Sequence, residues 1–559
     1  MSASYSDIIH SEYVAVPFRR PASSMSAPKT SSSDNGLTEE MIRESVIQQY
    51  EVNKKLVESG SPLETLSVCN NPLHTNESAV VLVSENGPEG TLARIDFAWF
   101  GFNTPDRYNP NILPYPPGSP YPYFGIGQQA DASKHHELMY CDMAWGLSKG
   151  IGRRILRCQT GIQKLEFPEW QSPNGSCVWR PFLEATNGPY DPRVFISPLG
   201  EPLMVVGTNG ITNCLSQYII DLRTMIPDLA DKMKIGANVP VRFRQLTELP
   251  RDLYDEVEKN WFLMYDDNNI GYVQHTIQNR SISALTDVDV LHSNHVVNLV
   301  KGEATPQCIT ALKKEYEANN DQINSDIHQA TNTLRVTLCE FPCIPTIHNT
   351  VLIEIFQVKY HSYLEVFYRR YVMIMNVTAP FEIIGRTNNL IYAGSDEKML
   401  IFTVSMAWDH ANFRHHESWN EEKYGGRAIW DAIEDQEAEE YENSIKDFNG
   451  QVRDPQLEKK SESSSSSSSL SESASPSPAE MAAVHTKPDP AADKEASKYS
   501  FLADIPTSRN SSYNNPLVNE YYHGWIDDTI ILNIGINDKD SGIVHVKARD
   551  LLQCMTPCR

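Results

Sequence analysis

The most constraining feature of this sequence is a series of short runs, rich in β-branched and aromatic residues, spread over most of its length. Gly, Asn, Asp or Pro breaks each run, which is typical of strands joined by turns. The alternation of strand and helix that a nucleotide-binding α/β sheet requires is missing. The pattern therefore predicts an all-β fold, which can be a sandwich, a barrel or a propeller. The runs span residues 78–85, 92–102, 202–210, 259–267, 269–277, 351–360, 370–377, 398–408 and 528–538.

Segments that favour helix or disorder are few. Residues 37–60 and 304–336 have helix-forming sequences, so we expect a few peripheral helices. Residues 1–40 are rich in Ser, Pro and Ala and predict a disordered arm. Residues 420–500 are first acidic and then Ser-rich, and they hold too few apolar residues to offset the entropy of ordering.

Strand-like sequence resumes after the Ser-rich segment, which indicates an insertion in one domain and not a linker between two. The expected organisation is an N-terminal arm over 1–40, a first part of the catalytic domain over 41–419, a disordered insertion over 420–500, and last strands over 501–559 that complete the domain. A length of 559 residues allows one large all-β domain.

The composition limits the partners. A net charge of −24 argues against a nonspecific grip on nucleic acid or on an anionic membrane. No run reaches the ~18 to 20 apolar residues of a membrane span, and the first 20 residues lack the apolar core of a signal peptide. The ten cysteines and five N-glycosylation sequons are weak indications of an oxidising compartment, and the cysteine spacings do not favour a metal site.

The run over 188–210, GPYDPRVFISPLGEPLMVVGTNG, places an acid and a base inside an otherwise apolar stretch. Charges are costly to bury unless they are paired or used. Pro192 disfavours helix at Asp191, so the Asp191 carboxylate is expected at the entrance of a strand. A carboxyl held in this way can act as a general acid or base. A turn-capping Asp191 that pairs with Arg193 is the structural alternative.

This run resembles the strand-turn-strand unit of the β-propeller enzymes that act on β-mannosides: bacterial β-mannoside phosphorylases and, more closely, fungal β-1,2-mannosyltransferases. Further matches follow in the same order at 258–265, 358–394, 398–409 and 527–553. The resemblance implies a five-bladed β-propeller. It also implies an inverting glycosyltransferase that adds β-1,2-linked mannose to mannan or glycoprotein glycans, with Asp191 as the proton-transfer residue.

The matched motifs also supply candidate binding residues. Phosphate leaving or attacking in an acidic protein needs a local cationic pocket, and Arg suits bidentate contact with phosphate. The resemblance implies that the acidic residue of the last motif binds sugar hydroxyls. GDP-mannose or mannose 1-phosphate is the expected donor, with a mannan-type oligosaccharide as acceptor and no cofactor, metal or nucleic acid. The candidates are Arg193, Lys259, His361, Arg369, Arg370 and, for sugar, Asp538.

Several alternatives stay open. A β-mannoside phosphorylase or hydrolase, or a noncatalytic carbohydrate-binding propeller, would share the same motifs. Two Asp-x-Asp triplets, at 287–289 and 538–540, would suit a metal-dependent transferase, but the strand-rich pattern opposes that fold. The resemblance implies a membrane anchor and a Golgi or secretory location. No such anchor is visible in the sequence, so a cytoplasmic location is also open.

Overall fold

The fold is described from a computed structural model. The elements below belong to residues 79–97, 107–116, 119–130, 136–148, 153–167, 188–210, 213–237, 239–249, 251, 255–285, 298–317, 324–341, 343, 345–361, 366–395, 399–409 and 521–558. The expected arm over 1–40, the helix over 37–60 and the insertion over 420–500 lie outside these residues. They stay predictions, as do the domain boundaries.

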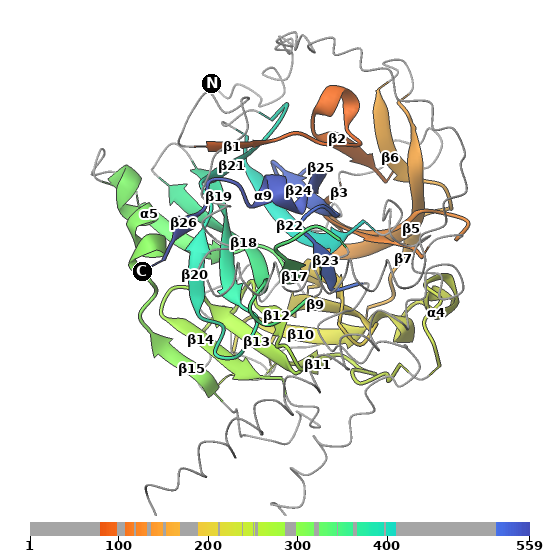
Figure 1. Ribbon diagram of the computed structural model, residues 1–559. Coiled ribbons are helices and arrows are strands. Elements are labelled where there is room, and N and C mark those ends of the chain that lie inside the picture. Colours follow the sequence, from red (N-terminus) through yellow and green to blue (C-terminus); the bar gives the residue numbers. More distant parts are fainter. Residues whose placement is uncertain are drawn as a thin grey trace, which may run out of the picture.

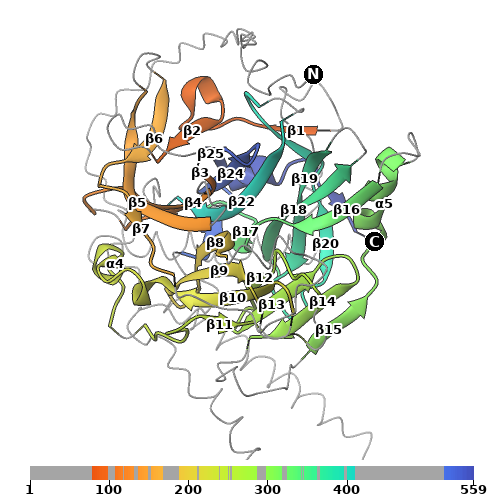
Figure 2. The same ribbon diagram turned by 180° about the vertical axis from the view of Figure 1, so that it is seen from behind.

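The described part of the chain is mostly β-strand, and its strands form five sheets of 2, 4, 4, 7 and 9 strands. In both views the sheets follow one another around the molecule in chain order, and strands from the two ends of the described sequence lie side by side (Figures 1 and 2). The meander that opens this order consists of β3 (Arg107–Pro114), β4 (Tyr123–Ala130), β5 (His136–Leu147), β6 (Arg154–Cys158) and β7 (Gln163–Lys164).

Two separate four-stranded antiparallel sheets come next. One contains β8 (Tyr190–Ile196), β9 (Pro202–Thr208), β10 (Ser216–Asp221) and β11 (Thr247–Glu248). The other contains β12 (Phe262–Tyr265), β13 (Gly271–Thr276), β14 (Arg280–Ala284) and β15 (Asn298–Glu303).

The seven-stranded sheet is built around two long strands, β18 and β19. Its members are β16 (Asn324–Gln329), β17 (Leu334–Thr337), β18 (Thr350–His361), β19 (Val366–Asn376), β20 (Ile383–Arg386), β23 (His523–Trp525) and β26 (Thr556–Pro557). A last group, β22 (Ile401–Trp408), β24 (Thr529–Ile536), β25 (Asp540–Lys547) and β2 (Ala93–Asp96), joins the opening meander through a parallel pairing of β2 with β6. β1 (Ala79–Leu82) pairs with β21 (Asn389–Tyr392).

Helices are short and few among the described residues. They are the 3-10 helices η2 (Pro88–Gly90) and η3 (Leu222–Thr224) and the α-helices α4 (Leu229–Lys232), α5 (Gln307–Glu317) and α9 (Ala548–Leu551). No helix in this part of the chain is long and apolar enough to cross a membrane.

All nine runs that the sequence marks as strands contain one. The helix expected over 304–336 is right for α5 and wrong beyond it, because that stretch continues as β16 and β17. In β16 the buried and exposed side chains alternate, with Ser325, Ile327 and Gln329 turned inward. That period of two suits a strand pairing with β18, and the tertiary pairing outweighs the helix-forming composition.

Apolar clusters fill the spaces between successive sheets, so that each sheet packs on the next. One cluster joins β4 and β5 to β9 and β10, another joins β9 and β10 to β12–β14 and on to β18 and β19. A third joins β18 and β19 to β22, β24 and β25, and a fourth joins β24 and β25 to β4–β6. The sequence of packed faces therefore returns to the sheet where it began.

Buried side-chain amides connect the strands that lie closest to the centre of this ring. Asn111 in β3 donates from Nδ2 to the carbonyl of Pro192 (2.9 Å) and accepts from the backbone N–H of Val194 (2.9 Å). Asn332, just before β17, bonds in the same way to the backbone N–H and carbonyl of Met406. These amides satisfy main-chain groups that no neighbouring strand can reach.

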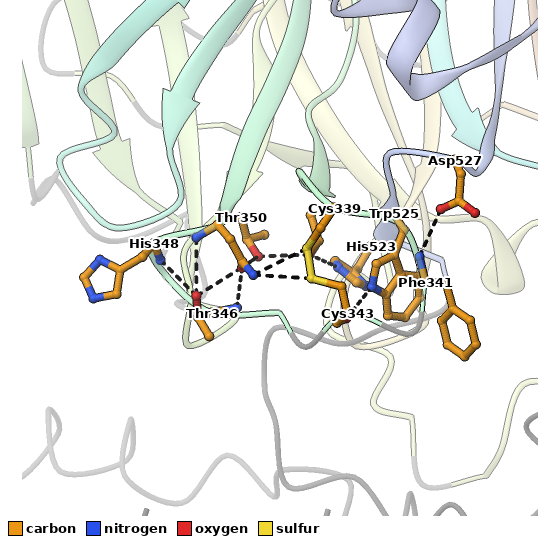
Figure 3. Close-up of a disulfide and its surroundings, with 11 residues drawn as sticks. Cys339, Phe341, Cys343, Thr346, His348, Thr350, His523, Trp525 and Asp527 are labelled. Atoms are coloured by element: carbon orange, nitrogen blue, oxygen red, sulfur yellow. Dashed lines mark hydrogen bonds between the residues drawn. A yellow bond between two sulfur atoms is a disulfide. The ribbon is translucent and has the colours of Figure 1, made fainter. Parts of the chain in front are cut away.

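Three disulfides join described cysteines: Cys141–Cys158, Cys308–Cys558 and Cys339–Cys343. The last one closes the turn after β17 and lies beside the segment that follows β23 (Figure 3). Trp525 donates from Nε1 to the Cys343 carbonyl (2.6 Å), and the backbone N–H of Phe341 donates to Asp527 (3.2 Å). These hydrogen bonds hold the disulfide-closed loop to β23 and to the residues just after it.

Candidate functional site

Three residues near the starts of β3, β8 and β12 have left-handed backbone angles: Asn109 (φ 50°), Asp191 (φ 48°) and Asn260 (φ 56°). Asn and Asp tolerate this region better than most residues, yet it still costs free energy. Such strain tends to occur where the surrounding structure holds a side chain for use. The three residues come from three different sheets. Left-handed residues therefore recur at the same end, the start, of these strands.

Asp191 is half-buried and is held through both its carboxylate and its backbone N–H. Asn109 donates from Nδ2 to Asp191 Oδ1 at 2.8 Å, and the Asp191 backbone N–H donates to Gln128 Oε1 at 3.0 Å. His136 Nδ1 lies 2.9 Å from Gln128 Nε2 and 3.0 Å from the Tyr108 hydroxyl. Because the Gln128 amide nitrogen can only donate, Nδ1 is the acceptor, and neutral His136 carries its proton on Nε2.

A second carboxyl, Asp538, comes from the β24–β25 turn, where its φ is 52°. Partial burial raises the pKa of Asp538, and the nearby charge of Asp191 raises it further. Asp191 and Asp538 are therefore close enough for the charge of one to act on the other. Asp191, predicted as the proton-transfer residue, and Asp538, predicted to bind sugar, therefore lie near each other.

Two tyrosines face this pair of carboxyls. Burial, Asp191 and Asp538 raise the pKa of Tyr108 far above its usual range. Burial and then the charges of Asp538 and Asp191 raise the pKa of Tyr368 to about 12. Both phenols therefore stay protonated at neutral pH and can donate hydrogen bonds. The Tyr368 ring also lies edge-on to Phe402, with 5.6 Å between centroids.

Arg193 follows Asp191 by two residues in β8 and is almost fully buried, with only 3% of its surface exposed. Its Nη2 donates to Asn260 Oδ1 (3.4 Å), its Nη1 donates to the Pro192 carbonyl (3.3 Å), and its guanidinium lies 5.3 Å from the centre of the Phe402 ring. Burial lowers the pKa of Arg193 to about 10, so it stays charged at neutral pH. The turn-capping alternative expects an ion pair between Asp191 and Arg193. No such pair is present among the described residues.

A second group gathers two more of the predicted residues. Lys259 is exposed and precedes Asn260, while His361 ends β18 with its Nδ1 3.9 Å from Asp326 Oδ2. Burial lowers the pKa of His328, and Lys359, His361 and Lys259 lower it further, while Asp326 acts in the opposite direction. Lys259 and His361 therefore belong to one cationic group around His328.

The two predicted arginines of β19 lie elsewhere. Arg370 is buried and donates from Nε to the Leu390 carbonyl (3.1 Å) and from Nη1 to the Ile401 carbonyl (3.3 Å), so it holds β19 to β21 and β22. Arg369 is half-buried opposite Val358, and neighbouring residues of a strand point to opposite faces. The residue that β19 brings to Asp191 and Asp538 is Tyr368.

Sequence reasoning did not find Tyr108, Asn109, Gln128, His136, Asn260, Tyr368 or Phe402. One signal was present: Asn109 precedes Pro110 just as Asp191 precedes Pro192, and both have left-handed angles at the start of a central strand. No group of three or more His, Cys, Asp or Glu side chains in the described ranges could hold a metal ion.

No protein-family model and no curated protein matches this chain. Among solved structures, a hypothetical protein from Leishmania major is similar with 9% identity and a TM-score of 0.32, covering 82% of this chain and 90% of its own. A mannose phosphorylase from Leishmania mexicana, in complex with phosphate, has 11% identity and a TM-score of 0.27 and covers 56% of this chain and 80% of its own. A GH62 hydrolase in complex with xylotriose has 12% identity, a TM-score of 0.25, and coverages of 58% and 85%. Likeness at this level decides neither fold nor function, so the argument below depends on the side chains.

Proposed function

We propose that this protein is a carbohydrate-active enzyme that transfers mannosyl groups, with the ring of packed sheets serving as a five-bladed β-propeller. Asp191 is the proton-transfer residue, and Asp538 and the two tyrosines bind sugar hydroxyls. The mannose specificity and the β-1,2 linkage rest on the resemblance of the sequence motifs. The site geometry supports the chemistry, whatever the sugar.

The observation that carries the proposal is the fixed Asp191 carboxylate beside Asp538. Asn109 and Gln128 hold Asp191 by hydrogen bonds of 2.8 and 3.0 Å, although its backbone angle is unfavourable. A turn-capping residue would have no need of a second carboxyl close by. A proton-transfer residue profits from a fixed position, because its geometry toward the reacting oxygen is then set in advance.

In the proposed reaction Asp191 takes the proton of the acceptor hydroxyl. The acceptor oxygen then forms a bond to the anomeric carbon of the donor, and the bond from that carbon to the donor phosphate oxygen breaks. The electron pair leaves with the phosphate. Attack from the face opposite the phosphate converts an α-linked donor into a β-linked product.

The cationic group supports a donor that carries phosphate. Lys259, Lys359 and His361 act electrostatically on His328, whose Nε2 has no hydrogen-bond partner among the described residues. Lys259 directly precedes Asn260, whose side chain accepts from Arg193, so the backbone links the two groups at this point. Positive charge placed there would stabilise the departing phosphate.

The same residues would serve a β-mannoside phosphorylase, in which orthophosphate attacks the anomeric carbon while Asp191 delivers a proton toward the glycosidic oxygen. The three described disulfides support folding in an oxidising compartment such as the secretory pathway. We retain transfer to an acceptor glycan as the main proposal because the motif resemblance is closer to the transferases.

The test is to incubate the purified chain with GDP-mannose or mannose 1-phosphate and short mannose oligomers, and to determine the linkage and anomeric configuration of the product by NMR. The proposal expects a β-linked product. Release of mannose 1-phosphate from β-mannosides, dependent on phosphate, would replace the transferase with the phosphorylase. A product that keeps the α-configuration would exclude the inverting mechanism.

A further inference from the structure

A chain of side-chain amides leads from Arg193 into the interior of the protein. Arg193 Nη2 donates to Asn260 Oδ1 at 3.4 Å. The backbone carbonyl of the same Asn260 accepts from Gln329 Nε2 at 2.9 Å. Asn260 has a left-handed backbone angle, so its position depends on being held by such contacts.

The amide of Gln274 continues this chain and ends it on a carboxyl. Its Nε2 donates to Gln329 Oε1 at 2.5 Å and to Glu354 Oε2 at 2.8 Å. Glu354 Oε1 and Gln274 Oε1 have no hydrogen-bond partner among the described residues. Two unpartnered acceptors in one buried network need a donor, and a proton on the Glu354 carboxyl provides one.

Glu354 differs from the other fully buried glutamate of the described chain. Glu201 is also 0% exposed, but it pairs with the Arg242 guanidinium at 2.5 Å. Glu354 is 0% exposed with no ion pair in the described residues. An unpaired buried carboxylate is costly, and such a group takes up a proton instead.

The surroundings of Glu354 support this reading. Gln274 on β13 and Arg280 on β14 favour the charged form, Tyr522 lies near enough to sense that charge, and Met373 is the opposite residue on β19. Burial outweighs Gln274 and Arg280, and it raises the pKa of Glu354 to about 8. The carboxyl is therefore mostly uncharged at neutral pH.

We propose that Glu354 is held uncharged and acts, through Gln274, Gln329 and Asn260, as the residue that positions Arg193 beside the carboxyl pair. This inference rests on the proposed function for its consequence in catalysis. When Glu354 ionises, an uncompensated charge enters the amide chain, and the chain must rearrange or admit water. The position of Arg193, and with it the reaction, then responds to the protonation of a residue that touches no substrate.

The experiment follows Arg193 directly. The full chain is labelled with ¹⁵N-arginine, the buried Nε–H signal of Arg193 is assigned by its loss in Arg193→Lys, and pH is raised through the neutral and mildly alkaline range. The wild type is expected to show a shift of this signal with a midpoint near 8, the value expected for Glu354. Glu354→Gln, which keeps the size and the uncharged state, is expected to abolish that step.

Glu201→Gln is the matched control, because it neutralises a buried glutamate outside the amide chain and should keep the step. A pH-difference infrared spectrum should show a protonated carboxyl in the wild type and in Glu201→Gln, and lose it in Glu354→Gln. A step that persists in Glu354→Gln, or a carboxyl that is already ionised at neutral pH, would overturn the inference.

These measurements need no substrate, so they decide the inference even if no sugar transfer is found. Where activity is present, the alkaline fall of kcat/KM should move to higher pH in Glu354→Gln and stay in place in Glu201→Gln. A merely structural role would lower the whole profile without moving this limb. If Glu354→Gln is active and its alkaline fall of kcat/KM does not move, the positioning role is excluded and the proposed function stays intact.

Discussion

Replacing Asp191 with Asn tests the candidate site most directly. The Asn side chain keeps the size of Asp. Its carbonyl oxygen can still accept from Asn109 Nδ2, which lies 2.8 Å from Asp191 Oδ1 in the wild type. The backbone bond to Gln128 is unaffected. What disappears is the group that takes the proton, and losing a general acid or base typically costs about 10²- to 10⁴-fold in rate. That range corresponds to roughly 3 to 5 kcal/mol of activation free energy.

A graded comparison separates proton transfer from positioning. Asn109→Ala keeps the Asp191 carboxylate but removes its fixing hydrogen bond. A hydrogen bond to a charged group contributes about 1.5 to 3 kcal/mol, so we expect a loss of roughly 10- to 150-fold. Sugar binding should survive Asp191→Asn, and both variants should stay folded because Asp191 is half-exposed to solvent.

The same variant tests whether Asp191 and Asp538 share a site. Without the negative charge of Asp191, the pKa of Asp538 should fall toward its ordinary value, while burial still holds it somewhat above. The assay is steady-state transfer with a ¹³C-aspartate NMR titration of wild type and variant. Full activity of Asp191→Asn, or an Asp538 midpoint that does not move, would refute the catalytic assignment.

Three further predictions concern a charge, a buried acid and a long segment. Arg193→Lys keeps the charge but loses the planar fork, so it should reduce turnover less than Asp191→Asn if charge alone matters, and comparably if bidentate geometry matters. Because the folded-state pKa of Glu354 is raised from 4.5 to about 8, its contribution to stability is fully present below pH 4.5 and is lost as pH rises through 8, by up to about 5 kcal/mol. Urea unfolding at about pH 5 and about pH 9 should show this decline in wild type and not in Glu354→Gln. Deleting residues 425–495 should leave activity and Tm largely intact, since loop length affects closure entropy only logarithmically, and a collapse of soluble yield would contradict this.

The strands were predictable where hydrophobic runs are unbroken, and the central strand β3 was not. Pro110 and two asparagines interrupt β3, so its sequence does not look like a strand. It pairs with β4 on one side, and on its other side the Asn111 amide bonds to the backbone of β8. A contact of this kind replaces strand pairing and leaves no periodic trace in the sequence.

The candidate site was predictable in its carboxyls and not in its surroundings. Asp191 stands out because it is a charge inside an apolar run, whereas His136 reaches the site through the pairing of β4 with β5. In β19 the choice between Tyr368 and Arg369 depends on which face of the strand meets β22, where Tyr368 packs on Phe402. A motif gives the residues of a strand in order, but their facing depends on register, which only the assembled sheets determine.

The closure of the ring has a consequence for how the protein is made. β2 pairs with β25, and the backbone N–H of His545 donates to Ser84 Oγ, a partner 461 positions earlier. During synthesis β2 cannot pair with β25 until the β24–β25 hairpin has been made. Contacts so distant in sequence make folding slow. Asp538 lies in the turn of that hairpin, between β24 and β25. A nascent chain therefore lacks one of the two carboxyls until its last strands join its first, and activity can begin only after folding is complete.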